Sequence, residues 1–354
     1  MTELAARAAD LPTLMALFEP GQVTDPYPAY REWRIRQPVA RPHERLFVLS
    51  RFADCEAVLA DAASFGHAEP GETRLFGGRV RQPRAGSFLR MNPPDHARLR
   101  RLVSRAFTPG RVKALTPHIE TITRELLAGI GSKAGPFDLV EELALPLPVR
   151  VICELLGIPP GDRDLLTQWS AALSRALDPD FLLTDEDRSS QRDVREAFRA
   201  YLRDLLPVRR QSPGEDLISA LVQVHDEGDK LSEDELIATA ILLLIAGHET
   251  TRSLISGGTL ALLRHPRQLA VLREQPELTE QAVVEMLRYD PPVQLLTRYA
   301  LHDAQVARTA IAAGSHVLLL IGAGNRDETV FRDPDSFEVC RDAHRHLAFG
   351  HGIH

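Results

Sequence analysis

The stretch from Ser232 to Pro266 constrains the fold of this chain most. It opens with SEDE, in which Ser232 suits the N-cap and Glu235 the N3 position of a capping box. Pro266 ends the run, so about 34 residues at ~1.5 Å each predict a helix of ~50 Å, long enough to cross a whole domain. Its apolar segment LIATAILLLIAG has only 12 residues, too few to span a bilayer. We therefore predict a central helix that is buried in protein.

The rest of the chain is also mainly helical in its pattern. Apolar residues recur three and four positions apart in six further segments: 52–61, 95–107, 115–130, 147–157, 191–206 and 279–289. Strand signals are short and scattered, at 46–49, 293–301 and 316–321. No interior stretch has the composition of a linker between domains. We predict a mainly α fold with small peripheral β-sheets (α+β), in a single domain over residues 1–354.

Composition narrows the class of protein. The chain is 44% hydrophobic and 26% charged with a net charge of −7, which is ordinary for a soluble globular protein and gives no sign of nucleic-acid binding. Its three cysteines, Cys55, Cys153 and Cys340, are far apart, which argues against a disulfide framework and for a reducing compartment. The first residues lack a basic region before an apolar stretch, so we expect neither signal peptide nor membrane anchor, and a cytoplasmic location.

The segment AGHETT, 246–251, places polar side chains directly after the apolar part of the long helix. An acid and two threonines there need partners or a wet cavity, because burying them unpaired costs several kcal/mol. Threonine hydroxyls can bond to carbonyls one turn earlier and loosen the helix, which would open a groove for a small molecule. A satisfied polar surface patch is about as plausible. A zinc-protease site is excluded, because the position that needs a second histidine is Arg252.

Two further pairs share a helix face by their spacing. Glu285 and Arg288 are three apart, and most such pairs are solvated and worth only ~0.3 kcal/mol. His96 and Arg100 are four apart, after a suitable N-cap at Asp95, and could hold a carboxylate or a phosphate. A basic solvated helix is the simpler interpretation of that segment.

Two segments near the C-terminus imitate other sites. HVLLLIGAGNRDETVF resembles a strand with a glycine-rich phosphate loop, but Asp327 stands where the third glycine belongs, so a dinucleotide site is disfavoured. HRHLAFGHGIH, 344–354, holds four histidines, whose spacing matches no standard zinc site. Surface or packing histidines are the simpler interpretation.

Taken together and in order, these segments resemble the cytochrome P450 family, specifically the soluble bacterial haem-thiolate monooxygenases, from about residue 25 to the last residue. The resemblance rests on AGHETT, on the E-x-x-R pair Glu285 and Arg288, on NRDETVFRDPDSF, on PPDHARLR and on FGHGIH. It implies a triangular helical prism around a long central helix, with haem b as cofactor. It also implies that Glu285 and Arg288 pair with an arginine of the NRDETVFRDPDSF region or its surroundings.

The resemblance implies roles for individual residues. Thr250 and Glu249 would be catalytic, with Thr250 acting on iron-bound oxygen and Glu249 relaying protons. The haem-binding residues would be those that contact the propionates or the haem face: His96, Arg100, Arg298, His354, Phe349, Gly350 and Ala246. The product would be a hydroxylated or epoxidised apolar substrate.

The haem-ligand loop of the family reads F-G-x-G-x-H-x-C. Its cysteine would therefore lie two positions beyond His354, where this sequence ends. The sequence contains no metal ligand at that place, and we expect the cysteine and the helix that follows it in an uninterrupted protein. A catalytically silent haem-binding or ligand-binding relative is the alternative, and a helical interaction scaffold is a third.

No flavin or nicotinamide fingerprint is present, so electrons must come from outside. The resemblance implies a ferredoxin and its reductase, and a monomeric enzyme. We expect the ferredoxin to dock near Arg98, Arg101 and Arg105, because these cations suit an acidic partner. By the same resemblance the substrate contacts would include Phe76, Phe88, Leu243, Val293 and Leu295.

Overall fold

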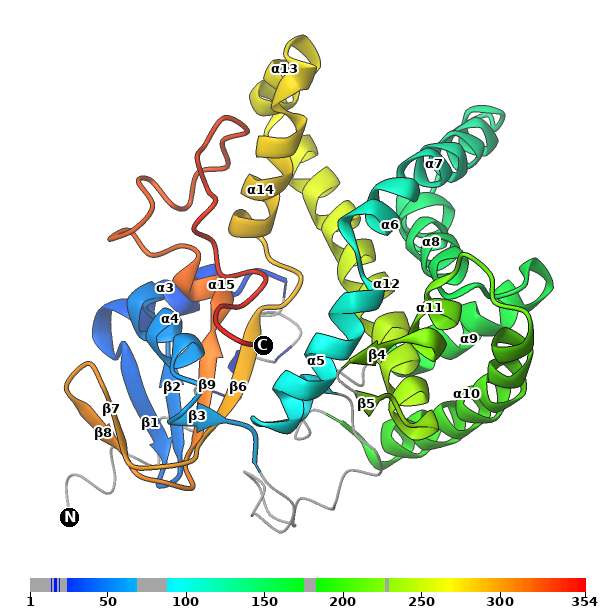
Figure 1. Ribbon diagram of the computed structural model, residues 1–354. Coiled ribbons are helices and arrows are strands. Elements are labelled where there is room, and N and C mark those ends of the chain that lie inside the picture. The colour runs from blue at the N-terminus through cyan, green and yellow to red at the C-terminus, as the bar shows by residue number, and fades with distance from the viewer. Residues whose placement is uncertain are drawn as a thin grey trace. The chain divides into compact units, whose positions relative to one another are not determined.

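A computed structural model describes residues 14, 16, 17, 19, 24–68, 88–174, 183–226 and 229–354 of the chain. Its helices of six or more residues are α3 (Tyr27–Arg36), α4 (Phe52–Ala60), α5 (Asp95–Ala106), α6 (Pro109–Ala114), α7 (Thr116–Gly131), α8 (Pro146–Leu156), α9 (Arg163–Ser174), α10 (Asp185–Gln211), α11 (Leu217–Gln223), α12 (Glu233–Arg264), α13 (Pro266–Glu274) and α14 (Thr279–Tyr289). Its strands are β1 (Val39–His43), β2 (Leu46–Leu49), β3 (Phe65–Gly66), β4 (His225–Asp226), β5 (Asp229–Lys230), β6 (Leu295–Ala300), β7 (Ala304–Val306), β8 (Thr309–Ile311) and β9 (His316–Leu320). A single turn, α15 (Ile321–Gly324), follows β9 (Figure 1).

The mainly helical fold with small sheets is confirmed, and every helix and strand predicted from periodicity is present. The largest boundary difference is α10, which is predicted over 191–206 and spans Asp185–Gln211. Thr184 caps it, and Asp187 completes a capping box outside the apolar pattern. Asp95 is the first residue of α5 and not its N-cap, a position that Pro94 occupies without a side-chain bond.

The chain forms two compact units, one of residues 1–82 with 257–354 and the other of residues 83–256. Each unit is compact, but compactness does not show that a unit folds on its own. The single domain over residues 1–354 therefore stays a prediction. The first unit contains the five-stranded sheet, of order β1-β2-β9-β6-β3. The second contains helices α5 to α11 and the larger part of α12 (Figure 1).

The sheet separates two apolar clusters of the first unit. In β9, Val317 and Leu319 pack with residues of α4, whereas Leu318 and Leu320 pack with residues of α3. Strand β2 alternates in the same way, since successive side chains of a strand point to opposite faces. Burial on both faces explains why these strands are continuous apolar runs. Strand β6 is antiparallel to β9 in the same sheet, so one of its faces lies toward α4 and the other toward α3.

Helix α12 crosses the core of the second unit before it enters the first. Ser232 and Glu235 exchange the two bonds of the predicted capping box, at 2.7 and 3.3 Å. The helix has 32 residues, about 48 Å at the usual rise. Apolar residues of its first three turns join the main cluster of that unit. No helix within the described part of the chain is long and apolar enough to cross a membrane.

Asp54 in α4 gives a prediction about stability. It is 9% exposed, and its Oδ2 lacks a hydrogen bond within the described structure. Burial raises the pKa of this carboxyl, Arg51 opposes the shift, and Asp327 adds to it. A raised folded pKa favours the protonated form, so stability falls as pH rises through the window above 3.8. We expect Asp54→Asn to raise Tm at pH 7 by about 1–3 °C in thermal unfolding, and to have little effect near pH 3.

Asp61, at the C-terminal end of the same helix, is the control of opposite sign. Its Oδ1 accepts a hydrogen bond from the amide of Ser64 at 3.0 Å, and contacts with Ser64 lower the pKa of the carboxyl. Its contribution is present at neutral pH and is lost as pH falls. Asp61→Asn is therefore expected to lower Tm at pH 7. A lower Tm for Asp54→Asn as well would contradict the burial argument.

Candidate active site

The two threonine hydroxyls in the polar segment of α12 are satisfied within their own helix. Thr250 Oγ1 donates to the carbonyl of Ala246 at 2.8 Å, and Thr251 Oγ1 donates to the carbonyl of Gly247 at 3.0 Å. These are the predicted bonds to the preceding turn. The helix nevertheless stays continuous through residues 246–251, so the predicted local opening is absent. Ala246 and Gly247 are exposed, after a run of mostly buried residues, and Thr250 is half-buried beside them.

Glu249 is held by neighbours on the same helix. It forms an ion pair with Arg252, and His248 Nε2 lies 3.5 Å from its Oε2. His248 is 1% exposed and its ring nitrogens make no hydrogen bond within the described structure. Burial lowers the pKa of this histidine, which Glu249 partly opposes. A neutral His248 and an anchored carboxylate therefore lie directly before Thr250.

Helix α5 positions His96 and Arg100 differently. His96 is 2% exposed, whereas Arg100 is exposed. Burial lowers the pKa of His96, and the nearby positive charge of Arg100 lowers it further. The two residues are four apart in the observed helix α5, which places them on one helix face, as their spacing predicts. An anion bound between them would relieve the repulsion between their positive charges.

Arg98 on the same helix forms ion pairs with acidic residues of the same unit. Its Nε donates to Asp229 at 2.6 Å and its Nη1 to Glu235 at 2.6 Å. Hydrogen bonding to Asp229 is the main cause of its raised pKa. Arg98 therefore joins α5 to the start of α12 and is poorly suited to its predicted role in docking, whereas Arg101 and Arg105 are exposed.

Arg298 lies in β6, within the first unit, where the strand was predicted. The side chain is 7% exposed. Its guanidinium donates to the carbonyl of Thr297 at 2.9 Å, and no carboxylate of the described residues lies within ion-pairing distance. Burial lowers its pKa, and no neighbouring charge contributes. A buried cation without a counter-charge is costly, so this position is suited to an anion that the protein itself does not supply.

The C-terminal turn FGHGIH lies against the same strand. A side-chain carbon at Gly350 would lie 3.9 Å from Leu296 of β6. Phe349 is 78% exposed, which is unusual for an aromatic side chain in a turn whose neighbours are packed. The ring of His354 meets the ring of His67 edge-on, with centroids 4.8 Å apart. The first unit therefore brings Arg298, His354, Phe349 and Gly350 to one sheet and its adjoining turn.

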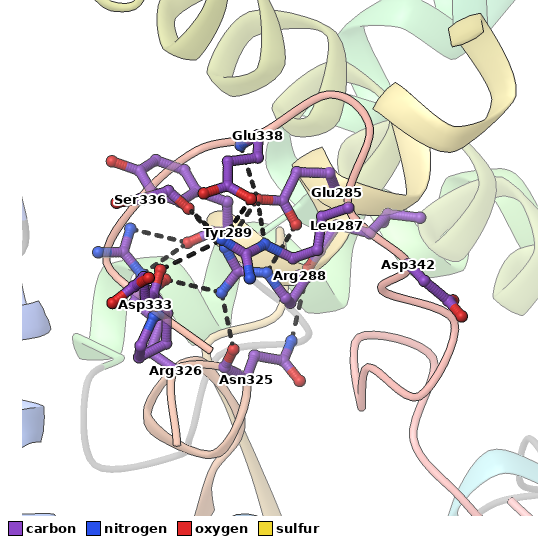
Figure 2. A network of polar contacts seen from close by, with 12 residues as sticks. Glu285, Leu287, Arg288, Tyr289, Asn325, Arg326, Asp333, Ser336, Glu338 and Asp342 are labelled. Atoms are coloured by element: carbon purple, nitrogen blue, oxygen red, sulfur yellow. Dashed lines mark hydrogen bonds and ion pairs between the residues drawn. The ribbon is translucent and has the colours of Figure 1, made fainter. Parts of the chain in front are cut away.

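Glu285 and Arg288 are not a solvated pair. Both are fully buried, and Arg288 donates to the two carboxylate oxygens of Glu285 at 2.7 and 2.8 Å. The remaining donors of Arg288 bond to the carbonyls of Asn325, Pro334 and Ser336 (Figure 2). All five guanidinium hydrogens are thus engaged. The pair joins α14 to the long coil after α15.

The third member of this network, beside Glu285 and Arg288, is Arg341. Its Nε donates to Glu285 at 3.1 Å. Arg326 of NRDETVFRDPDSF instead donates to the carbonyl of Tyr289 at 2.9 and 3.0 Å and lies over the Tyr27 and Tyr289 rings. The sequence pattern alone could not choose between the arginines of this region, because the choice depends on the path of the coil.

The network also positions the C-terminal turn. The side-chain oxygen of Asn325 accepts a hydrogen bond from the amide of Leu347 at 2.7 Å, and its own carbonyl accepts from Arg288. Arg288, Asn325 and Leu347 therefore form a continuous connection from α14 to the start of FGHGIH. His346, one of the four clustered histidines, accepts a hydrogen bond from the amide of Ala348. That histidine has a packing role.

Two of the three cysteines are poor sources of a thiolate. Cys55 and Cys153 are buried, and burial raises the pKa of each thiol, that of Cys153 to about 11. Cys340 is exposed, and its carbonyl accepts a hydrogen bond from Gln281. Within the described residues, no group of three or more histidine, cysteine or acidic side chains is arranged to hold a metal ion.

Comparisons with known proteins agree with this geometry. The family model for cytochrome P450 matches residues 180–353. The chain is 41% identical to vitamin D(3) 25-hydroxylase of Pseudonocardia autotrophica, over 93% of this chain and 81% of that protein. It is 40% identical to mycinamicin IV hydroxylase/epoxidase of Micromonospora griseorubida, over 92% and 81%. The ligand-free structure of CYP164A2 from Mycobacterium smegmatis superposes with a TM-score of 0.86 and 43% identity, over 96% and 86% of the two chains.

The chain therefore belongs to the cytochrome P450 family. It has the fold of that family and is an oxidoreductase of the P450 monooxygenase type. The resemblance identified from the sequence motifs is confirmed.

The substrate contacts expected from the resemblance are only partly described. Phe76 lies outside the described residues. Phe88 and Leu243 pack against the main cluster of the second unit, and Leu295 packs against the cluster beside α3. Two residues of the site were missed from the sequence, Arg341 and His67. His67 follows a two-residue strand that no periodicity could reveal.

Proposed function

We propose that this protein inserts one oxygen atom from O2 into an apolar small molecule, by hydroxylation or epoxidation, with two electrons from an external donor and haem b as cofactor. The carrying observation is the face of α12 at Ala246, Gly247 and Thr250. It exposes two small residues beside a half-buried hydroxyl, directly after the buried part of the helix. A flat cofactor and a substrate can approach the backbone only where side chains are this small.

The residues of this chain fit a haem. Phe349 offers an exposed aromatic face, and Arg298 is a buried cation without a carboxylate among the described residues. Two propionates would supply the missing negative charge. Following the family resemblance, we assign Arg298, His354, His96 and Arg100 to these carboxylates, because charge-assisted hydrogen bonds offset their desolvation.

A haem that carries a thiolate ligand would supply electron density that favours cleavage of the O–O bond. Because the family's loop reads F-G-x-G-x-H-x-C and FGHGIH matches its first six positions, we propose that this ligand is a cysteine two positions after His354. Asn325 and Arg288 would orient the loop that carries it, through the hydrogen bond to Leu347.

Thr250 and Glu249 would handle protons. The only proton of the Thr250 hydroxyl is donated to the Ala246 carbonyl. Its oxygen can therefore accept a hydrogen bond and hold a proton donor in place. Glu249, beside it in sequence, would exchange protons with solvent after leaving its ion pair with Arg252.

The carbon-monoxide difference spectrum of the reduced haem-bound protein, together with its intact mass, tests this proposal. A thiolate-type Soret shift and a mass that includes the cysteine segment are expected. A mass that ends at His354 without such a shift would instead favour the catalytically silent relative. A screen for compounds that change the haem spin state would then identify the substrate class, for which we expect a medium to large apolar molecule.

Electron transfer from a ferredoxin is expected to depend on Arg101 and Arg105. Both are exposed on α5, and complementary charges accelerate the encounter with an acidic partner. We predict that the double change to glutamate slows stopped-flow reduction about tenfold at low salt, and that added salt slows the parent protein. The double change of Arg124 and Arg332 to glutamate, which alters the charge equally at two exposed arginines outside α5, is the control. Equal slowing by the control would contradict this docking face.

The proposed compartment is the cytoplasm, which is supported by three unpaired cysteines, two of them buried. Among relatives, the names vitamin D(3) 25-hydroxylase and 6-deoxyerythronolide B hydroxylase indicate large organic substrates for those proteins. The substrate of this protein is proposed only at the level of that class.

A further inference from the structure

His67 follows the short edge strand β3, whose pairing with β6 is defined. Phe65 pairs with Ala300, and Gly66 pairs with Tyr299, in antiparallel register. The amide of Leu301 also donates to the carbonyl of Ser64 at 2.8 Å, which extends the contact by one residue beyond the strand ends. One step of the same register in the other direction brings His67 opposite Arg298.

Residues directly opposite in an antiparallel pair lie on one face of the sheet, with Cβ atoms about 4.5–5.5 Å apart. The face is identified by its neighbours. Phe65 and Ala300 both belong to the apolar cluster on the α4 side, and Leu296 packs against that cluster. Side chains two apart share a face. His67 and Arg298 therefore lie on the α4 side of the sheet.

The C-terminal turn brings His354 to the same face. A side-chain carbon at Gly352 would lie 2.3 Å from the carbonyl oxygen of Leu59 in α4, so only glycine, here with φ +81°, allows this approach. Gly350 lies against Leu296 of β6. The rings of His67 and His354 are 4.8 Å apart, edge to face. Three side chains that can donate to an anion, His67, Arg298 and His354, thus converge from three separate segments of one compact unit.

The charge of the buried Arg298 favours binding of a carboxylate at this face. Arg298 is 7% exposed and is without a carboxylate partner among the described residues. None of Phe65, Ala300 and Leu296, the neighbours that define the face, carries a charge. Donors without a buried counter-charge favour an anion from outside the protein.

We propose that His67 is a binding residue for a haem propionate, completing with Arg298 and His354 a three-donor carboxylate site. This inference rests on the proposed function, since the carboxylate is that of the cofactor. The motifs of the sequence assign no role to His67. Its contribution is a hydrogen bond to a charged oxygen, which retains the cofactor and does not take part in oxygen chemistry.

The test is the rate at which the haem-bound protein loses haem to an excess of a haem-scavenging apoprotein. His67→Ala is expected to lose haem about tenfold faster than the parent, the usual effect of one hydrogen bond to a charged group. His67→Lys, which keeps a donor and a charge, is expected to restore most of the difference. His302→Ala, a change of an exposed histidine after β6, is the matched control and should leave the rate unchanged.

A second cofactor shows whether His67 acts through the propionate or through a general effect on folding. In protein reconstituted with the dimethyl ester of haem, whose propionates cannot be ionised, the parent and His67→Ala should lose cofactor at equal rates. An acceleration that persists with the ester, or a His67→Ala rate within twofold of the parent with ordinary haem, would overturn the assignment. A parent protein that binds no haem would overturn the proposed function and this assignment together, whereas a haem-bound parent confines the failure to His67.

Discussion

Arg288→Ala is expected to leave little folded protein. The substitution removes five hydrogen bonds at a fully buried position. Among the described residues, Glu285 would then keep Arg341 and the amide of Glu338 as the partners of its buried carboxylate. Removing one partner of a buried ion pair costs about 3–5 kcal/mol, a large part of the 5–15 kcal/mol that stabilises a typical domain.

Soluble yield and the midpoint of urea unfolding measure this effect. Arg332→Ala is the matched control, because the side chain of Arg332 is 94% exposed and its loss should change the midpoint little. Arg288→Lys keeps the positive charge but not the planar fork, and we expect an intermediate loss. If the free energy of unfolding of Arg288→Ala lay within about 1 kcal/mol of the parent value, the network would not be a main support of the fold, because breaking a buried ion pair is expected to cost about 3–5 kcal/mol.

Thr250→Ala is expected to uncouple electron consumption from product formation. The substitution removes the hydroxyl oxygen that can accept a hydrogen bond beside the exposed Ala246 and Gly247. Without it, protons are delivered less selectively, and electrons are diverted to hydrogen peroxide. We expect product per electron pair to fall roughly tenfold, at the low end of the range for a positioned proton-transfer group. Parallel measurement of nicotinamide oxidation, peroxide and product gives the ratio.

Thr251→Ala is the control for helix effects. Thr251 makes the same bond to the preceding turn, with Gly247 as acceptor, but is exposed at the next position around the helix. Its substitution should leave coupling near the parent value, and Thr250→Ser should retain most coupling because the hydroxyl is kept. Unchanged coupling in Thr250→Ala would remove the role assigned to this residue.

The central helix shows how much local pattern can predict. The capping box at Ser232, the apolar turns after it and Pro266 are all local signals, and the observed helix α12 matches them within one residue at either end. Strands β2 and β9 were also predicted, because burial on both faces leaves an uninterrupted apolar run. Strand β3 was not, because two residues have no period and owe their conformation to β6.

For the candidate site, too, the sequence predicted some features and left others open. Residue types and intervals were enough to propose Glu285, Arg288, Thr250 and Arg298, since each stands in a motif of the family. The same intervals gave no measure of burial. They left Glu285 and Arg288 open to interpretation as a solvated pair, and they suggested Arg98 for docking although it binds Asp229 and Glu235.

The sequence by itself therefore determined the family, the mainly helical class and the extent of the long helix, because these depend on periodicity and on motifs within short segments. Only the tertiary structure decided which arginine completes the pair of α14, which carboxylates hold Arg98, and that His67 meets His354. Those partners are 56, 131 and 287 residues apart or more. Contacts over such separations depend on how the segments pack, and packing is a property of the whole folded chain and not of any segment.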